Sequence, residues 1–224
     1  QVENTYKFLN EKYPEYLYKC PIRNIMVSSV PMDNIEKYYK PRDRLTEIIK
    51  DPQDKLEYKL RDLTTILTGL TGLKTIDLGV TGSILTRSHS PEFSDIDLTV
   101  YGLKASTALK KTLLETRRHD GVIQPFNSAK QKVWSIKRNG RFPLVFSELM
   151  EFAERRWNYG EYMGTYFSVH PVRTNNEIAE KYGDDNYFSL GKVKGKATVS
   201  DVSESIYLPA IYRLDDVKAD TEIE

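Results

Sequence analysis

Two short runs of residues, separated by a glycine turn and a polar connector, constrain the fold of this chain most. Thr75–Val80 is β-branched and apolar, which predicts a buried strand. Asp95–Tyr101 alternates polar and apolar side chains, which predicts a second strand. Because residues two apart on a strand point to the same face, Asp95 and Asp97 should project together, away from Ile96.

The turn after the first predicted strand is a candidate phosphate-binding site. Gly82 and Ser83 lie in a stretch of small residues, where a backbone can approach a ligand closely. Ser83–Arg87 then predicts the first turn of a short helix. Free N–H groups at a helix start suit a phosphate, as does a serine hydroxyl, and Arg87 is a further candidate contact.

The carboxylates of Asp95 and Asp97 are candidate metal ligands. Each charge disfavours the other, so the pair favours protonation or a bound cation. Carboxylate oxygens suit Mg²⁺ or Mn²⁺, and Mg²⁺ retains water ligands and takes up substrate phosphates. A phosphate-binding turn followed by a metal-binding strand is a coherent site for nucleotidyl transfer, in which the metal orients a triphosphate.

Gly82-Ser83, eleven intervening residues and then Asp95-Ile96-Asp97-Leu98 resemble the signature of the nucleotidyltransferase superfamily related to DNA polymerase beta. The flanking text, GVTGSILTRSH and SDIDLTVYG, is similar to a group of archaeal predicted nucleotidyltransferases. The resemblance implies an α/β (α+β) fold with a mixed sheet flanked by helices. It also implies that Gly82 and Ser83 hold the triphosphate, that Asp95 and Asp97 hold Mg²⁺, and that a nucleoside monophosphate passes from an NTP to a hydroxyl.

That superfamily usually carries a third carboxylate on a later strand, often as the base for the attacking hydroxyl, and this chain does not show it clearly. The predicted strand Glu161–Val172 places Tyr166, Ser168 and His170 on the face where an Asp is expected. The alternatives for the role are Glu148, Glu161, His170 and Asp77, although Asp77 is of a kind that commonly bonds local backbone. Without such a group, the substrate itself would assist deprotonation, or the site would bind a nucleotide without turnover.

Composition sets outer limits on class and partners. The 224-residue chain has 33 basic and 32 acidic residues, so its net charge of +1 gives no overall field that favours nucleic acid. Residues 130–156 are the most basic region near the predicted site, although glutamates interrupt it. The single cysteine, Cys20, excludes an internal disulfide and fits a reducing compartment. No apolar run is long enough to span a bilayer and no signal peptide opens the chain, which predicts a cytoplasmic protein without a membrane partner.

The remaining sequence predicts a chain of three parts. Residues 1–50 are expected to be an extension packed on the core, 51–183 a nucleotidyltransferase-like core, and 184–224 a small β-rich module. Frequent prolines in the first part predict short strands and at most brief helices. Asp51 and Pro52 predict the start of a helix that ends at Gly69 and Gly72.

The second half of the chain predicts further elements. We expect helices over 105–118, 128–138, 144–157 and 174–182, strands over 121–126, 161–172, 196–202 and 206–212, and a frayed end over 215–224. The helix over 128–138 has a candidate cap in Asn127.

The sequence therefore predicts a metal-dependent nucleotidyltransferase that uses an NTP and an acceptor of unknown identity, such as RNA or protein. A non-catalytic nucleotide- or RNA-binding module, or an interaction module, on the same fold is the alternative. A third catalytic carboxylate would favour the enzyme, and its absence would favour the alternative. The sequence does not identify such a carboxylate.

Overall fold

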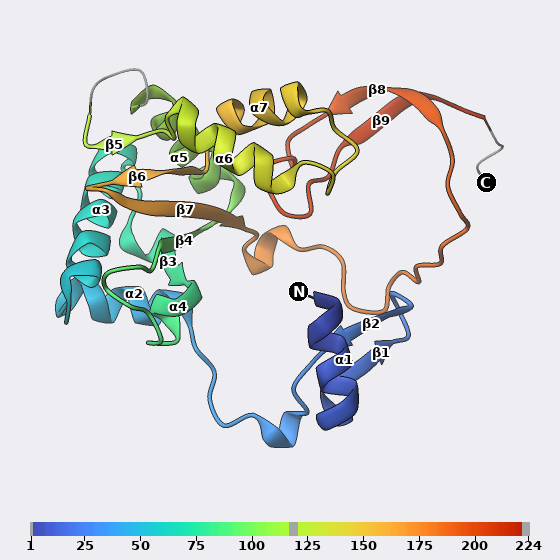
Figure 1. Ribbon diagram of the computed structural model, residues 1–224, viewed down its shortest axis with the longest axis horizontal. Coiled ribbons are helices and arrows are strands. Elements are labelled where there is room, and N and C mark those ends of the chain that lie inside the picture. Colours follow the sequence, from blue (N-terminus) through green and yellow to red (C-terminus); the bar gives the residue numbers. More distant parts are fainter. Residues whose placement is uncertain (1, 117–120, 221–224) are drawn as a thin grey trace. The chain divides into compact units, whose positions relative to one another are not determined.

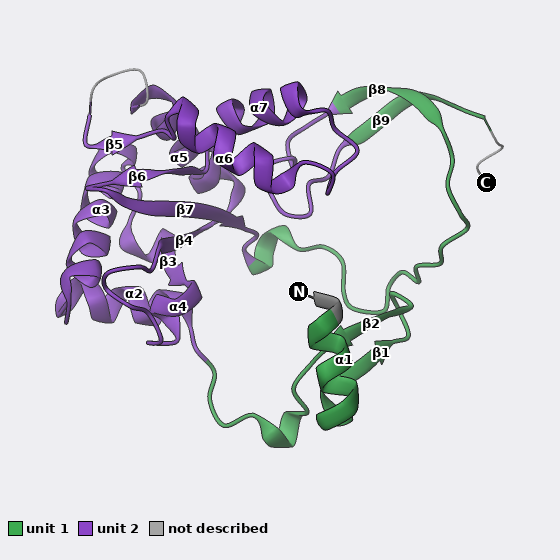
Figure 2. Cartoon of the chain, viewed as in Figure 1, with its two compact units in different colours: residues 1–38, 175–200, 213–224 green, residues 39–174, 201–212 purple. Residues whose placement is uncertain are grey.

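The computed structural model describes residues 2–116 and 121–220. The described residues divide into two compact units, which Figure 2 distinguishes by colour. The larger unit comprises those in 39–174 and 201–212, and the smaller unit those in 1–38, 175–200 and 213–224. Every residue of the predicted site lies in the larger unit.

A five-stranded mixed sheet forms the centre of the larger unit within the described residues (Figure 1). Its strands are β3 (Leu78–Thr81), β4 (Ile96–Tyr101), β5 (Ile123–Gln124), β6 (Tyr159–Tyr162) and β7 (Thr165–Val172). They are arranged in the order β3-β4-β7-β6-β5. Only β4 and β7 pair in parallel, and the other neighbours are antiparallel. The α+β architecture expected from the sequence is thus confirmed.

Six helices accompany this sheet in the described part of the larger unit. They are α2 (Pro41–Lys50), α3 (Lys55–Thr71), α4 (Gly82–Leu85), α5 (Leu103–Thr116), α6 (Ser128–Arg138) and α7 (Phe146–Arg155). Helices α3 and α5 contact each other, and α5 also contacts β4 and β7. Leu70, near the end of α3, is exposed. Four earlier leucines of α3 at three- and four-residue spacing are buried, as the sequence pattern predicts: Leu56, Leu60, Leu63 and Leu67.

The sheet has two faces of different character. Ile96 and Leu98 of β4 lie opposite Phe167 and Val169 of β7, and all four are buried in the core cluster with α3 and α5. The alternate residues of the same strands point to the other face, where Asp97 pairs with Ser168. We call this second surface the polar face of the sheet.

Helix α3 begins three residues later than the sequence predicts. Asp54, rather than Asp51, is its N-cap, and Asp54 Oδ1 accepts hydrogen bonds from Leu56 N (2.9 Å) and Glu57 N (3.0 Å). Asp51 instead ends α2. At the other end Gly72 adopts a left-handed conformation (φ 72°) as the C-cap, while Gly69 stays inside the helix.

The predicted strand over 161–172 is in fact a hairpin of β6 and β7. Tyr162 pairs with Thr165, so the loop consists of Met163 and Gly164, which both have positive φ (47° and 74°). Positive φ at both central residues is the geometry of a tight two-residue hairpin turn. A methionine at the first position gave no sequence signal for it.

The first strand of the sheet is also shorter than predicted. Residues 75–77 form a short 3-10 turn, and β3 begins at Leu78. Asp77 accepts a hydrogen bond from Lys74 N (2.9 Å), which closes the turn. The chain therefore reaches the turn at Gly82, the predicted phosphate-binding site, through only four strand residues.

The smaller unit is more helical at its start than the prolines suggest. It contains α1 (Val2–Lys12), a hairpin of β1 (Leu17–Cys20) and β2 (Ile25–Ser28), and a pair formed by β8 (Gly195–Asp201) and β9 (Arg213–Ala219). The pair β8–β9 supplies the β-rich character expected near the C-terminus. Strand β9 corrects the expectation of a frayed end over 215–219, and residues 221–224 lie outside the described part.

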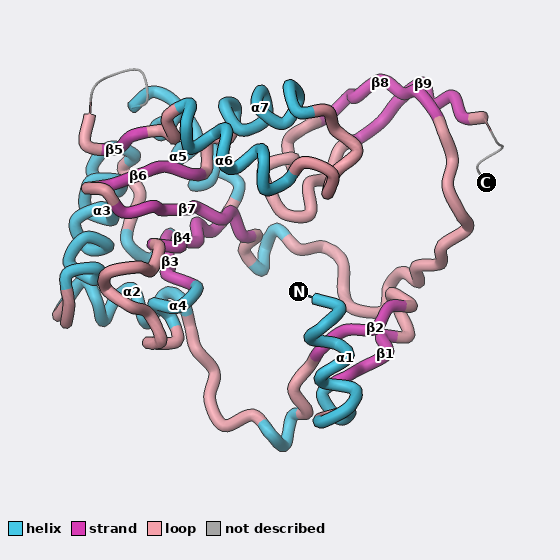
Figure 3. The backbone as a smooth tube through the Cα atoms, in the orientation of Figure 1, coloured by secondary structure: helices cyan, strands magenta, loops and turns pink. Residues whose placement is uncertain are grey.

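Two further expectations for the second half of the chain are wrong. Residues 174–182 contain only a short 3-10 turn, Asn175–Glu177, rather than a helix. Residues 202–212 form turns and loop rather than a strand (Figure 3), with a cis peptide bond between Leu208 and Pro209. By contrast, α6 spans 128–138 and is capped by Asn127, as predicted.

Among the described residues, no helix combines the length and the apolar character that crossing a membrane would require.

The packing of β6 against β7 gives a test of the fold. A Cβ at Gly160 would lie 2.8 Å from both Gln124 O and Phe167 Cε1. Gly160→Ala should therefore lower the free energy of unfolding by about 1–3 kcal/mol, measured by urea denaturation. Gly69→Ala is the control, because a Cβ there meets nothing within 4 Å. It should raise the free energy by about 0.5–1 kcal/mol, and a neutral Gly160→Ala would contradict the packing described.

Candidate functional site

The predicted phosphate turn lies directly against one of the predicted metal ligands. Thr81, the last residue of β3, pairs with Asp97 of β4, and α4 begins at Gly82. Gly82 has φ 65°, and a Cβ at this position would lie 2.6 Å from Asp97 Oδ2. A side chain here would be strained and would displace the carboxylate, so the close approach depends on glycine.

The other oxygen of Asp97 is held by β7. Ser168 donates a hydrogen bond to Asp97 Oδ1, and His170 Nε2 lies 3.9 Å from the same oxygen. Ser168 Oγ is also 2.8 Å from His170 Nε2. The nearby His170 contributes most to lowering the pKa of Asp97, burial opposes this, and the hydrogen bond from Ser168 lowers the pKa further. Asp97 is therefore kept ionised.

The hydrogen bonds imply one tautomer of His170. A serine hydroxyl has a single proton, and Ser168 gives it to Asp97, which as a carboxylate can only accept. Ser168 Oγ must then accept from His170, so Nε2 carries a proton. In neutral His170 this leaves Nδ1 as the atom that can take up a further proton.

Asp95 lies immediately before β4 and is exposed. Partial desolvation raises the pKa of its carboxyl, and the negative charge of Asp97 raises it further. The structure thus brings Asp95 and Asp97 close enough to repel each other. A cation bound by both would relieve that repulsion.

The other two predicted phosphate contacts differ in their surroundings. Ser83 lies in α4 next to Gly82, and its carbonyl accepts from Ser88 N (2.9 Å). Arg87 is exposed and makes an ion pair with Glu47 of α2 (2.7 Å). An arriving phosphate would therefore have to compete with Glu47 for this guanidinium.

Of the four candidates for a third catalytic group, His170 is the one placed at Asp97. Glu148 accepts from Val145 N (2.8 Å) at the start of α7. Glu161 is paired with Lys130 of α6. Asp77 closes the turn before β3, which is the local backbone role that the sequence suggested. Ser168 of β7 pairs directly with Asp97 of β4, at a position where a carboxylate was expected.

Aromatic rings and arginines cover the polar face beyond His170, and the sequence analysis did not identify them. Tyr166 of β7 stacks on Tyr159 of β6, with ring centroids 5.6 Å apart. The guanidinium of Arg156 lies 3.5 Å from the centroid of the Tyr159 ring, and that of Arg138 lies 4.0 Å from the centroid of Trp134. The basic character of 130–156 was visible in the sequence. Trp134 lies in α6 with Arg138, whereas the Tyr159 ring under Arg156 comes from β6.

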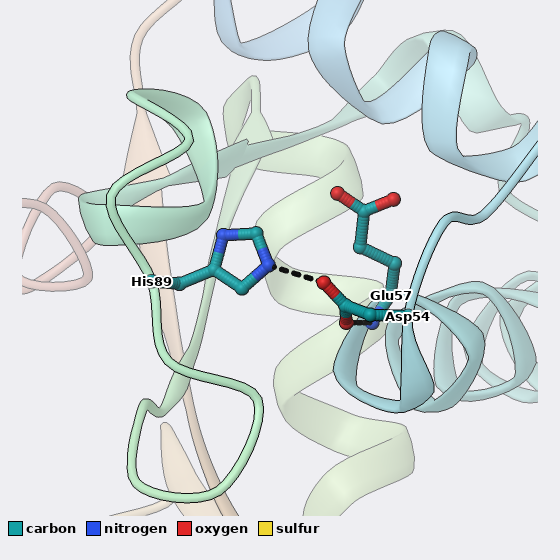
Figure 4. Close-up of side chains that lie close together, drawn as sticks. All are labelled: Asp54, Glu57 and His89. Atoms are coloured by element: carbon teal, nitrogen blue, oxygen red, sulfur yellow. Dashed lines mark hydrogen bonds and ion pairs between the residues drawn. The ribbon is translucent and has the colours of Figure 1, made fainter.

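A second polar cluster joins the loop after α4 to the start of α3 (Figure 4). His89 Nε2 lies 2.8 Å from Asp54 Oδ2, and the His89 side chain is only 8% exposed. Among the residues that the structure describes, Asp54, Glu57 and His89 are the one His/Cys/Asp/Glu trio whose ligand atoms all lie within 4.8 Å of one another.

The environment of this trio does not favour a cation. Glu57 is paired with the buried Arg44 through one oxygen and accepts from Gln53 N (2.9 Å) through the other. Asp54 uses one oxygen to cap α3 and the other to contact His89. Arg44 thus supplies the positive charge, and the cluster is a structural tie between α3 and the loop.

The pH dependence of stability tests this tie. Burial of Asp54 opposes its ionisation, but hydrogen bonds from Glu57 N, His89 and Leu56 N together lower the pKa of its carboxyl. A lowered pKa stabilises the fold above the unfolded value of about 3.9, and this contribution is lost as the pH falls through the folded pKa.

Asp54→Asn keeps a capping side chain but cannot titrate. Its free energy of unfolding, measured by denaturation at a series of pH values, should therefore fall less steeply than that of wild type below about pH 4. Asp62→Asn, on the exposed side of the same helix, is the control and should follow wild type. Parallel curves for wild type and Asp54→Asn would contradict the tie.

Comparison with known proteins gives one relative. The chain is 32% identical over 216 residues to an uncharacterized protein of Methanocaldococcus jannaschii, covering 94% of this chain and 62% of that protein. The chain therefore spans less than two thirds of the length of this relative. Searches with descriptions of protein families found no match, and no solved structure matches either.

Proposed function

We propose that the larger unit is a metal-dependent nucleotidyltransferase. It would bind an NTP at Gly82, Ser83, Asp95 and Asp97 and transfer the nucleoside monophosphate to a hydroxyl acceptor. The observation that carries this proposal is the approach of Gly82 to Asp97, where a Cβ would lie 2.6 Å from Oδ2. A turn that suits phosphate and a carboxylate that suits a metal ion thus share one small space.

The residues present fit Mg²⁺ or Mn²⁺. The carboxylates of Asp95 and Asp97 are hard oxygen donors. Ser168 donates a hydrogen bond to Oδ1 of Asp97, and Oδ2 lies toward Gly82. Partial burial raises the pKa of Asp95 most, and the negative charge of Asp97 raises it further; a bound cation would offset this repulsion. When bound, the ion would orient the triphosphate and neutralise charge that develops on it.

The chemistry then needs an atom to accept the proton of the attacking hydroxyl. As the hydroxyl oxygen forms its bond to the α-phosphorus, the bond from that phosphorus to the oxygen bridging to the β-phosphate breaks. Pyrophosphate leaves with the bonding electron pair. His170 Nδ1 accepts the proton, because Nε2 already carries one and donates it to Ser168.

A non-catalytic nucleotide- or RNA-binding module is the second candidate. The observation that favours it is Ser168, which stands opposite Asp97 in place of a carboxylate. The enzyme and a nucleotide-binding module both require nucleotide binding at the turn, so turnover separates these two; an RNA-binding module does not require an NTP there. A reducing compartment such as the cytoplasm fits the single cysteine under either reading.

Thermal melting with each of the four NTPs tests the nucleotide site. An NTP at about a hundred times its dissociation constant should raise the free energy of unfolding by about 2.7 kcal/mol. For wild type, we expect this rise with at least one of the four NTPs. We expect it only when Mg²⁺ or Mn²⁺ is present. Asp97→Asn, which still accepts from Ser168, should lose the metal-dependent part.

Two further variants sharpen that measurement. Gly82→Ala should lose the response, because its Cβ would displace Asp97 Oδ2. Asp62→Asn removes an equal charge from the exposed side of α3 and should respond as wild type does. No rise with any NTP in wild type would count against the enzyme and against a nucleotide-binding module, and would leave the RNA-binding module.

Turnover of a labelled NTP tests the role of His170. Glutamine at this position can donate to Ser168 but cannot take up a proton. His170→Gln should therefore lower the rate of pyrophosphate release by about 10²–10⁴-fold while the NTP melting response is retained. An unchanged rate in His170→Gln would refute its role as the base, and a wild type without turnover would favour the binding module.

A further inference from the structure

A pocket of about 470 Å³ lies within the larger unit beside the predicted site. Its walls come from the end of α7, from β6 and β7, and from the loop 205–212. The charged and aromatic residues that line it include Arg155, Arg156, Tyr159, His170, Tyr207 and Tyr212. The volume is in the range of pockets that enclose small ligands, about 300–1,000 Å³.

The loop wall of this pocket is fixed to β7 rather than loosely placed. Arg173, directly after β7, makes an ion pair with Glu204 (3.2 Å). Its guanidinium also lies 4.2 Å from the centroid of the Tyr207 ring, which is 5% exposed. The loop between β8 and β9 therefore contributes side chains to a site formed by the sheet.

The pocket meets the predicted reaction centre at His170. That residue lines the pocket and lies 3.9 Å from Asp97 Oδ1. Gly82, which follows β3, contacts the same carboxylate at Oδ2. Because the sheet order is β3-β4-β7, the phosphate turn and the pocket lie on opposite sides of Asp97. A triphosphate donor on the turn side would leave the pocket side for the acceptor.

The lining determines what the acceptor should look like. Tyr212 offers an exposed aromatic ring, and Arg156 adds a guanidinium that lies 3.5 Å from the centroid of the Tyr159 ring. Stacked rings and guanidinium planes bind nucleobases without needing one particular base. Arg155 is exposed on the same wall and makes an ion pair with Glu151 one turn earlier in α7 (2.5 Å), so a phosphate would compete with that carboxylate for the guanidinium.

We propose that this pocket is the acceptor site and that it takes a nucleotide unit carrying a free hydroxyl. The proposal rests on the function proposed above for the donor side. The base stacks on Tyr212, the phosphate competes with Glu151 for Arg155, and the hydroxyl faces His170. The same chemistry describes a free mononucleotide and the terminal nucleotide of an RNA strand.

Binding in the absence of metal and NTP tests the pocket independently of turnover. The probes are AMP and fluorescein-labelled hexaadenylate, titrated in EDTA into the whole chain. Tyr212→Ala and Arg155→Gln, both at exposed side chains, should each weaken binding roughly tenfold or more. Tyr58→Ala on α3 and Lys111→Gln on α5 are matched controls at exposed positions and should bind as wild type does.

The outcomes separate this proposal from the donor-site proposal. Hexaadenylate binding tighter than AMP would assign the terminal nucleotide of a strand, and equal affinity would assign a free nucleotide. No binding of either probe to wild type, or equal binding to wild type and both pocket variants, would overturn the acceptor site. Loss of the NTP melting response with probe binding retained would instead overturn the donor site and leave the pocket standing.

Discussion

The buried ion pair between Arg44 of α2 and Glu57 of α3 supports the side of the sheet on which the phosphate turn lies. Both side chains are almost fully buried, and Arg44 Nε also donates to Ile84 O in α4 (3.2 Å). One guanidinium thus connects three helices, and the last of them begins at Gly82. Removing one member would leave the other charge buried and unpaired, which is among the most destabilising changes a protein can suffer. The position of the turn against Asp97 therefore depends on residues that never approach a substrate.

The parallel pairing of β4 with β7 is the second determinant of the site. It places Ser168 beside Asp97 and His170 beside Thr99, so the polar residues of two distant segments share one face. The same register places the apolar alternates of both strands against α3 and α5. A slip of one residue would bury Asp97 in the core and expose Ile96. Burial of the apolar side chains of β4 and β7 fixes the register of the two strands. The polar side chains on the opposite face are aligned as a consequence.

Much of the fold was predictable from local patterns, and the partners within the site were not. Helix α6 and its Asn127 cap, the buried leucines of α3 and the orientation of Asp97 follow from spacing alone. The start of α3 was misplaced because Asp51-Pro52 and Asp54 are both good start signals. The tertiary contact of Asp54 with His89 favours the second. The contact of Ser168 with Asp97 depends on strand register between segments about seventy residues apart, which no local pattern encodes. Residues 206–212 resembled a strand because of their apolar and aromatic side chains, but of these only Tyr207 is buried and the segment forms a loop.

The serine opposite Asp97 has a consequence for the charge that the reaction centre can balance. A hydroxyl can donate to one carboxylate oxygen, which makes the two oxygens of Asp97 chemically unequal. An aspartate in its place could only accept, so it would repel Asp97 and add a third negative charge to the pair already present. With Ser168, the pair Asp95 and Asp97 carries only two negative charges, and one of the four carboxylate oxygens accepts a hydrogen bond from the serine. The identity of one side chain on β7 thus sets how much negative charge gathers at this end of the sheet.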